Sequence, residues 1–158
     1  MLLRLLDERP SIDPFSQYGQ DPGAPRGAIE FRDVSFVYPT RTDRPALNHL
    51  SLVIPPGASV AFVGATGAGK STIVAMLERF YDPSSGAILL DSWPISSLNV
   101  TRYRRLIGLV SQEPTLYSGS IKMNLTIGLE DDDKQPSDGD IEHACKQAKI
   151  YDFIMSLP

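Results

Sequence analysis

The residues from Gly64 to Thr72 combine side-chain types and spacing that suit the binding of phosphate groups. Glycines let the backbone bend until several N–H groups point at one anion. Lys70 adds a full positive charge for the outer phosphates, and the Ser71 hydroxyl is an oxygen ligand of the kind that Mg²⁺ prefers. The stretch matches the phosphate-loop pattern G-x-x-x-x-G-K-[ST] and reads Gly64-Ala65-Thr66-Gly67-Ala68-Gly69-Lys70-Ser71-Thr72.

The residues on either side of this loop supply the strand and the helix that such a loop needs. Residues 58–63 form a short apolar run, which is typical of a buried parallel strand. After the loop, apolar residues recur at helical spacing at Ile73, Met76, Leu77 and Phe80. A helix that begins here directs the positive end of its dipole at the phosphates. A chance glycine-rich turn is the alternative, and this flanking pattern disfavours it.

The composition indicates about one globular domain. The chain has 158 residues, of which 42% are hydrophobic, and this is enough for one core. The net charge of −4 disfavours a nucleic-acid-binding surface, which is usually basic. No apolar run approaches the roughly 18 residues of a membrane-spanning helix. The single cysteine, Cys145, cannot form an internal disulfide, and we expect it to pack on the apolar face of the last helix.

The remaining pattern predicts an α/β domain preceded by a linker. Residues 10–28 are rich in proline and glycine and indicate a partly extended linker. Strands at residues 29–38, with a turn or bulge at Arg32-Asp33, and at residues 46–54 suggest an antiparallel sheet beside the phosphate loop. Further along we expect a strand at 87–90, a short helix at 99–105, a buried strand at 106–110, a short helix at 120–125, an acidic loop from 130 to about 139, and a last helix with Asp138 or Asp140 as its N-cap.

The order of these features resembles the nucleotide-binding domain of ATP-binding cassette (ABC) transporters, specifically exporters of the multidrug-resistance, P-glycoprotein-like type. The resemblance covers nearly the whole chain, and the phosphate loop is its Walker A motif. Residues 9–13 are similar to the connection that leaves the last transmembrane helix, and residues 29–39 to the segment leading to the adenine-stacking A-loop. Residues 80–86 are similar to the turn after the Walker A helix, and residues 109–114 to the Q-loop.

The resemblance implies a role for two residues outside the phosphate loop. Tyr38, in the A-loop segment, offers a ring on which adenine stacks, although a core or edge tyrosine is the commoner case from sequence alone. Gln112, in the Q-loop, would supply an amide oxygen that binds Mg²⁺ or orients water. The implied cofactors are ATP and Mg²⁺. The implied nucleotide ligands are Tyr38, Gly64, Ala65, Thr66, Gly67, Ala68, Gly69, Lys70, Ser71, Thr72 and Gln112, with Ser71 and Gln112 holding the metal.

The fold class implied is that of a P-loop NTPase, an ABC-type ATPase core with an N-terminal antiparallel β subdomain. We expect residues 1–28 to be a linker from a transmembrane domain and residues 29–158 to be the N-terminal part of the nucleotide-binding domain. The expected partners are that transmembrane domain and a second nucleotide-binding domain in a head-to-tail ATP sandwich, with no nucleic acid. The expected location is the cytosolic face of a membrane, although the chain itself has no transmembrane segment.

The function implied is ATP binding and hydrolysis coupled to export of a substrate. The LSGGQ signature, the Walker B strand with its catalytic glutamate and the switch histidine do not occur in the sequence, so we expect a core that is incomplete at its C-terminus. Lys70 and Gln112 would contribute to catalysis without completing the site. The alternatives are an ATP-binding fragment that does not hydrolyse, a small P-loop kinase, and a DNA-repair ATPase of the same superfamily.

Overall fold

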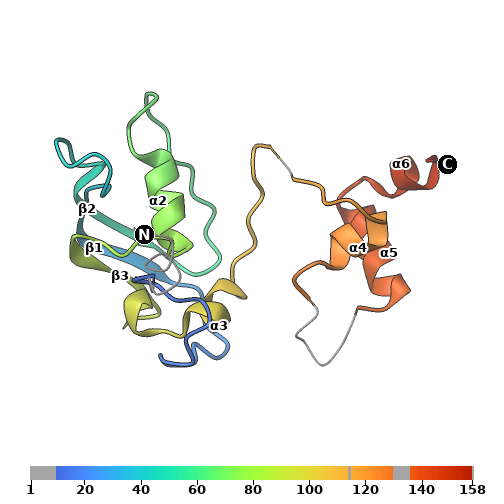
Figure 1. Cartoon of the computed structure of the whole chain (residues 1–158), viewed down its shortest axis with the longest axis horizontal. Coiled ribbons are helices and arrows are strands. Elements are labelled where there is room, and N and C mark those ends of the chain that lie inside the picture. Colours follow the sequence, from blue (N-terminus) through green and yellow to red (C-terminus); the bar gives the residue numbers. More distant parts are fainter. Residues whose placement is uncertain (1–9, 114, 130–135, 158) are drawn as a thin grey trace, which may run out of the picture. The chain divides into compact units, whose positions relative to one another are not determined.

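The computed structural model describes residues 10–113, 115–129 and 136–157, and the chain divides into two compact units (Figure 1). The predicted helix end at residues 1–9, the Q-loop residue Pro114 and the first part of the acidic loop, 130–135, lie outside the described residues. The first unit ends at Leu109 and contains β1 (Ile29–Phe36), β2 (Leu47–Ile54), α2 (Lys70–Leu77), β3 (Ser85–Leu90), β4 (Trp93–Pro94), the 3₁₀ helix η1 (Ile95–Ser97) and α3 (Val100–Arg104).

The strands form one antiparallel sheet in the order β2-β1-β3-β4, which confirms the predicted N-terminal antiparallel subdomain. Strand β1 is central, with Phe31 opposite Leu52 of β2 on one side and opposite Ile88 of β3 on the other. The register shifts between Phe31 and Val34, and Asp33 has a φ of 51°, so the predicted bulge is present. A bulge of this kind re-aims the strand that follows it.

The core of the first unit lies between the sheet and its helices. Ile73 and Met76 are buried on α2, as the helical spacing predicts, and they pack with Phe31, Ile88 and other strand residues. Phe80 does not join them, because it follows the end of α2 and is exposed. The buried cluster consists of Phe31, Val34, Phe36, Leu47, Ile73, Met76, Ile88, Leu90, Ile95, Leu98 and Tyr103.

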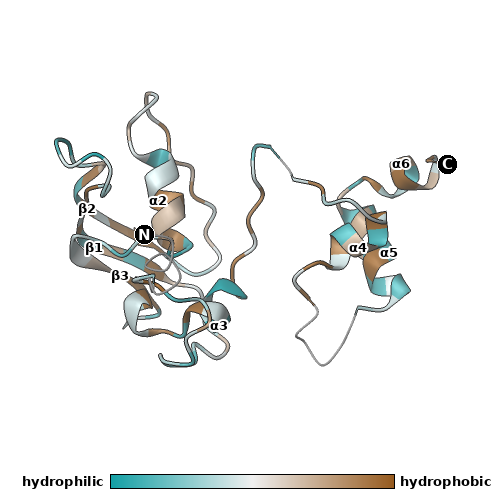
Figure 2. Cartoon of the chain, viewed as in Figure 1, coloured by the Kyte–Doolittle hydropathy of each residue, from teal (hydrophilic) through white to brown (hydrophobic). Residues whose placement is uncertain are grey.

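Two predicted strands are wrong, because residues 58–63 and 106–110 adopt no strand. A strand needs a neighbour that accepts and donates its ladder hydrogen bonds. Among the described residues, neither run has such a neighbour. Val63 is 94% exposed, whereas Phe62 still packs against the core, so only part of the first run is buried. Figure 2 shows hydrophobic residues along the segment that follows α3.

The second unit begins at Val110 and contains α4 (Ile121–Thr126), α5 (Asp138–Gln147) and α6 (Tyr151–Met155). The N-cap of α5 is Ser137, so the prediction of Asp138 or Asp140 is wrong. Asp140 instead completes a capping box: its amide donates to the Ser137 hydroxyl, and its carboxylate accepts from the Ser137 amide. Cys145 is buried on α5, which confirms its predicted packing role.

Candidate nucleotide-binding site

The phosphate loop takes its shape from two glycines with left-handed backbone angles. Gly67 has a φ of 82° and Gly69 a φ of 87°, values that side-chain-bearing residues rarely adopt. Gly69 also lies against Leu47, the first residue of β2, and against Ala46, which precedes that strand. A Cβ at Gly69 would stand 2.6 Å from the carbonyl oxygen of Ala46 and 3.0 Å from the side chain of Leu47. The pattern requires glycine at this position because no side chain fits there.

Helix α2 begins directly after this turn and points its N-terminus at the loop. Gly69 is its N-cap, and no side chain of the described residues caps this end. The first intrahelical bond here runs from the Ile73 amide to the Gly69 carbonyl, at 3.0 Å. An α-helix leaves its first N–H groups without helical acceptors, and these groups carry the positive end of the helix dipole. This end of α2 therefore suits an anion such as phosphate.

The side chain of Lys70 folds over the loop. Its Nζ donates to the carbonyl oxygen of Gly64, at 2.7 Å, and to that of Ala65, at 2.8 Å. An ammonium group has three N–H donors, and these two bonds place its charge above the loop that the glycines shape. A cation, a helix N-terminus and a glycine-rich loop thus lie together, which is the donor set that phosphate groups need.

Tyr38 lies beside this loop, although the sequence separates the two by about thirty residues. Its hydroxyl is 3.1 Å from the hydroxyl of Thr72 in the first turn of α2. Its ring makes an edge contact with Phe36, at 4.9 Å between ring centroids, and another with Tyr81, at 5.3 Å. The bulge-bearing strand β1 and the turn after α2 therefore hold Tyr38 at the phosphate loop. The sequence did not indicate the contact with Tyr81.

The loop and the β1–β2 connection enclose one hollow of about 590 Å³. Sequence reasoning missed part of its wall, namely Arg41, Asp43 and Arg44, although they follow Tyr38 in a loop predicted to be polar. The predicted site residues that line the hollow are Tyr38, Thr66, Gly67, Gly69, Lys70, Ser71 and Thr72. The predicted residues Gly64, Ala65 and Ala68 belong to the same loop and shape it without lining this hollow.

Gln112 is the one predicted ligand that the first unit does not contain. It lies in the second unit, where it is exposed. Its part in binding a metal or water stays a prediction. Ser71, by contrast, stands at the start of α2 and faces the hollow together with Lys70.

The sheet, the phosphate loop and helix α2 define a P-loop nucleotide-binding fold. The ABC transporter family model matches residues 47–157, which include the whole loop. This chain belongs to the ABC transporter family, and it has the ATPase fold of that family with an antiparallel sheet near its N-terminus.

Similar proteins support this assignment over almost the whole chain. The ABC-type transporter MDR1 of Aureobasidium melanogenum is 52% identical over 99% of this chain, which corresponds to 12% of that protein. The ABC multidrug transporter atrD of Emericella nidulans is 53% identical over 98% of the chain and 11% of its own length. The structure of a bacterial Atm1-family ABC exporter with ATP bound aligns with a TM-score of 0.80 and 36% identity, over 99% of this chain and 26% of that one.

These relatives are much longer than the present chain, which spans about an eighth of the curated proteins it matches. In the described parts of the chain, none of the helices has the length and the apolar composition needed to cross a bilayer.

Proposed function

We propose that this chain binds ATP together with Mg²⁺ at the hollow beside the phosphate loop. One observation carries the proposal: the uncapped N-terminus of α2, the ammonium of Lys70 and the ring of Tyr38 adjoin one hollow of about 590 Å³. The family of the chain implies nucleotide binding, and a relative whose structure aligns with this chain has ATP bound. Binding of the phosphate chain and of adenine by these groups is consistent with both.

The chain's own residues divide the work of binding between them. Lys70 and the first-turn amides of α2 would neutralise and hold the phosphates. The Ser71 hydroxyl would bind Mg²⁺, which supplies further positive charge beside the phosphates, and Gln112 would add a second oxygen ligand. Tyr38 would stack on adenine, since an aromatic ring accepts any base without hydrogen-bond readout.

The wider role that we propose is that of the ATP-binding portion of an ABC exporter. Relatives that cover the chain are named as multidrug transporters, and the aligned structure is that of an exporter. Residues 1–28 would then lead from a transmembrane domain, and residues 29–158 would belong to the nucleotide-binding domain on the cytosolic face of the membrane. ATP would be held between this domain and a second one, arranged head to tail, and its binding and hydrolysis would be coupled to efflux of a substrate.

The proposal is tested by titration of the purified chain with a fluorescent ATP analogue in the presence of Mg²⁺, beside the Lys70→Ala variant. We expect saturable binding that unlabelled ATP competes away and that Lys70→Ala abolishes, with an unchanged circular dichroism spectrum. Lys122→Ala is a matched control, because it removes a lysine from a helix of the second unit. Equal affinity in the Lys70→Ala variant and the unsubstituted chain would refute the assignment of the phosphate loop.

A further inference from the structure

The segment that precedes the sheet lies against the first unit, and we call its residues 14–28 the leader strap. Asn99 holds one end of the strap. Its side-chain Nδ2 donates to the carbonyl oxygens of Ser16, at 3.1 Å, and Tyr18, at 3.2 Å. The backbone continues the contact: the Asn99 amide donates to Gln20 at 2.8 Å, and the Gln20 amide donates to Ser97 at 2.9 Å. Asn99 is only 7% exposed, and its two side-chain bonds to the strap are partly buried.

Gly19 shows how closely the strap approaches. Its φ is +104°, and a Cβ there would stand 2.5 Å from the Asn99 nitrogen and 2.7 Å from the Leu98 oxygen. Gly23 offers a contrast within the same strap. Its φ is +59°, and a Cβ there would meet no atom within 4 Å. The strap therefore packs backbone against backbone at Gly19 and stands clear of its neighbours at Gly23.

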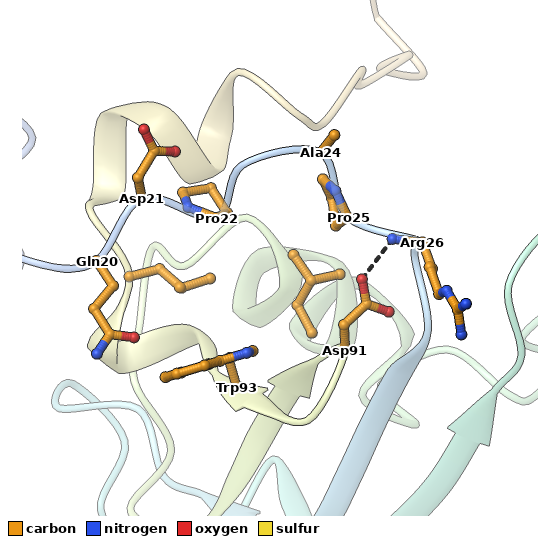
Figure 3. A pocket seen from close by; sticks show the side chains of 10 residues that line it. Gln20, Asp21, Pro22, Ala24, Pro25, Arg26, Asp91 and Trp93 are labelled. Carbon is orange, nitrogen blue, oxygen red and sulfur yellow. Dashed lines mark hydrogen bonds between the residues drawn. The ribbon is translucent and has the colours of Figure 1, made fainter.

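Asp91 holds the other end of the strap (Figure 3). Its carboxylate accepts from the amides of Arg26 at 2.5 Å, Gly27 at 3.3 Å and Ala28 at 2.9 Å. Between the two ends the strap spans a hollow of about 420 Å³ that Trp93 helps to line. The strap is thus fastened at both ends to residues that follow β3.

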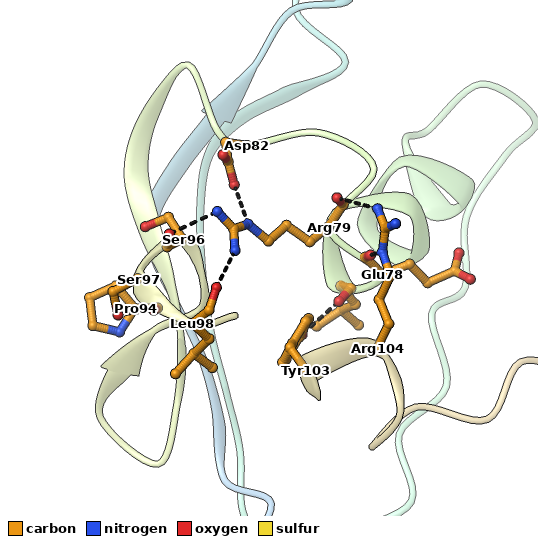
Figure 4. Close-up of polar contacts among 10 residues, drawn as sticks. Glu78, Arg79, Asp82, Pro94, Ser96, Ser97, Leu98, Tyr103 and Arg104 are labelled. Carbon is orange, nitrogen blue, oxygen red and sulfur yellow. Dashed lines mark hydrogen bonds and ion pairs between the residues drawn. The ribbon is translucent and has the colours of Figure 1, made fainter. Parts of the chain in front are cut away.

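Arg79 holds the residues that alternate with Ser97 and Asn99 in the same segment (Figure 4). The guanidinium of Arg79 donates to the carbonyl oxygens of Leu98, at 2.7 Å, and Ser96, at 2.8 Å, and pairs with Asp82 at 3.2 Å. Arg79 follows the C-cap of α2 directly and is 8% exposed. Residues 96–99, which we call the bridge, therefore contact the strap and the residue that follows the C-cap of α2.

Helix α3 adds a second link to the end of α2. The Tyr103 hydroxyl donates to the carbonyl oxygen of Leu77 at 2.6 Å. The Arg104 guanidinium donates to the carbonyl oxygens of Glu78 and Arg79, both at 2.9 Å. The last carbonyls of a helix have no helical donors, so these side chains satisfy the end of α2 and add positive charge there. Burial raises the pKa of Tyr103 to about 12, so its hydroxyl stays protonated and able to donate at neutral pH.

Asn99 belongs to both links. Its Oδ1 accepts from the Arg102 amide at 3.0 Å and so caps α3, while its Nδ2 holds the strap. We propose that the bridge couples the leader strap to α2, and through α2 to the phosphate end at Lys70, with Asn99 and Arg79 as the positioning residues. Release of the strap would loosen the bridge, free the end of α2 and weaken phosphate binding. In an intact exporter this would carry movement of the leader to the nucleotide site.

Two substitutions disrupt the contact between the strap and the bridge. One changes Asn99 on the bridge, and the other changes Gly19 on the strap. Asn99→Asp keeps an oxygen that caps α3, since aspartate and asparagine are equally good N-caps, and it removes both side-chain donors to the strap. Gly19→Ala leaves the bridge residues unchanged and forces the strap away from them. Gly23→Ala is the matched control, because it adds the same methyl group at positive φ in open space.

Amide hydrogen exchange of the full chain, without nucleotide, tests the coupling directly. Both Asn99→Asp and Gly19→Ala should speed exchange at Gln20 and also at the amides of Glu78, Arg79 and Phe80, which are bonded within the last turns of α2. Gly23→Ala should leave these rates unchanged. Faster exchange at Gln20 with no change at the end of α2 would overturn the proposal. Unchanged exchange at Gln20 in both variants would overturn it too, because the contacts would not hold the strap.

A second measurement uses nucleotide and therefore rests on the proposed function. Thermodynamic linkage is reciprocal, so a strap that affects phosphate binding must itself be affected by it. Inorganic tripolyphosphate and MgATP should bind about five-fold more weakly to both release variants. They should also slow exchange at Gln20 in the unsubstituted chain. Equal affinity in all variants would overturn the coupling alone, whereas absence of binding to the unsubstituted chain would refute the proposed function and leave the exchange test to decide the coupling.

Discussion

A methyl group added at Gly69 tests the proposed origin of the phosphate loop's shape. Gly69→Ala places a Cβ 2.6 Å from the carbonyl oxygen of Ala46, a distance at which something must shift. Gly67→Ala is the matched comparison. The two glycines have nearly the same φ, 87° and 82°, but a Cβ at Gly67 would meet no atom within 4 Å. The difference between the variants therefore isolates the contact with the residue that leads into β2.

The expected losses of stability follow from two costs, that of the left-handed backbone and that of the clash with Ala46. A left-handed backbone costs an L-residue about 1–2 kcal/mol, and both variants incur it. Forcing an extra carbon into a filled space costs about 1–3 kcal/mol more, and only Gly69→Ala incurs this. We therefore expect a loss in the free energy of unfolding of about 1–2 kcal/mol for Gly67→Ala and about 2–5 kcal/mol for Gly69→Ala.

Urea unfolding followed by circular dichroism measures both losses, and titration with tripolyphosphate measures the effect on the site. Gly69→Ala should weaken tripolyphosphate binding more than Gly67→Ala does, because relief of the clash moves the N-cap of α2 away from Ala46. Equal losses of stability and affinity in the two variants would show that backbone strain alone accounts for the glycines. The reasoning from the Ala46 contact would then be wrong.

Three further predictions concern single side chains. Tyr38→Ala should weaken ATP binding by about 1–3 kcal/mol and tripolyphosphate binding far less, while Tyr38→Trp should retain ATP affinity; equal losses for both ligands would argue against stacking. Backbone donors at Ala28 first, then Gly27 and Arg26, lower the pKa of Asp91 below 3.8, so its stabilisation of the strap is present above pH 3.8 and is lost as the pH falls through the folded value. Acid titration should therefore speed amide exchange at residues 26–28 beyond its intrinsic pH dependence, and Asp91→Asn should remove that excess. Ser137→Ala should destabilise α5 by about 1 kcal/mol, visible as lost helicity, whereas an unchanged spectrum would contradict the capping box.

The parts of the fold that were predicted correctly depend on neighbouring residues in the chain. Alternating apolar residues predict β1 and β2, and the break in this alternation at Arg32-Asp33 marks the bulge. Successive side chains of a strand point to opposite faces, so the order of apolar and polar residues along one strand is enough to predict which face is buried. The phosphate loop and α2 are likewise local: glycines set the turn, and the apolar spacing sets the buried face. The wrong predictions concern pairing. The apolar character of residues 58–63 does not specify a partner strand, and without one they form no ladder.

The sequence predicted which residues form the candidate site better than it predicted the contacts between them. The phosphate loop is a motif with fixed spacing, whereas the placement of Tyr38 against Thr72 and Tyr81 depends on how β1 packs on α2. The leader strap was missed for a different reason. Two of the four hydrogen bonds that join it to the bridge in the described residues link backbone groups alone, and backbone groups leave no mark on composition. Only Gly19 and Asn99 carry a side-chain signal of that contact, and neither stands out in a segment rich in proline and glycine.

Helix α2 is fixed at both ends by elements other than the predicted parallel strands. At its start, Gly69 abuts Ala46 and Thr72 contacts Tyr38, so the antiparallel sheet sets its direction. At its end, side chains of α3 satisfy its carbonyls, and Arg79 ties it to the bridge. The unpaired residues 58–63 contribute mainly through Phe62, which packs on the core. Because a rigid helix transmits displacement along its length, its end and its phosphate-binding start should respond together. In the proposed coupling the strap affects the end of α2 through the bridge, so the effect must extend over the length of this helix.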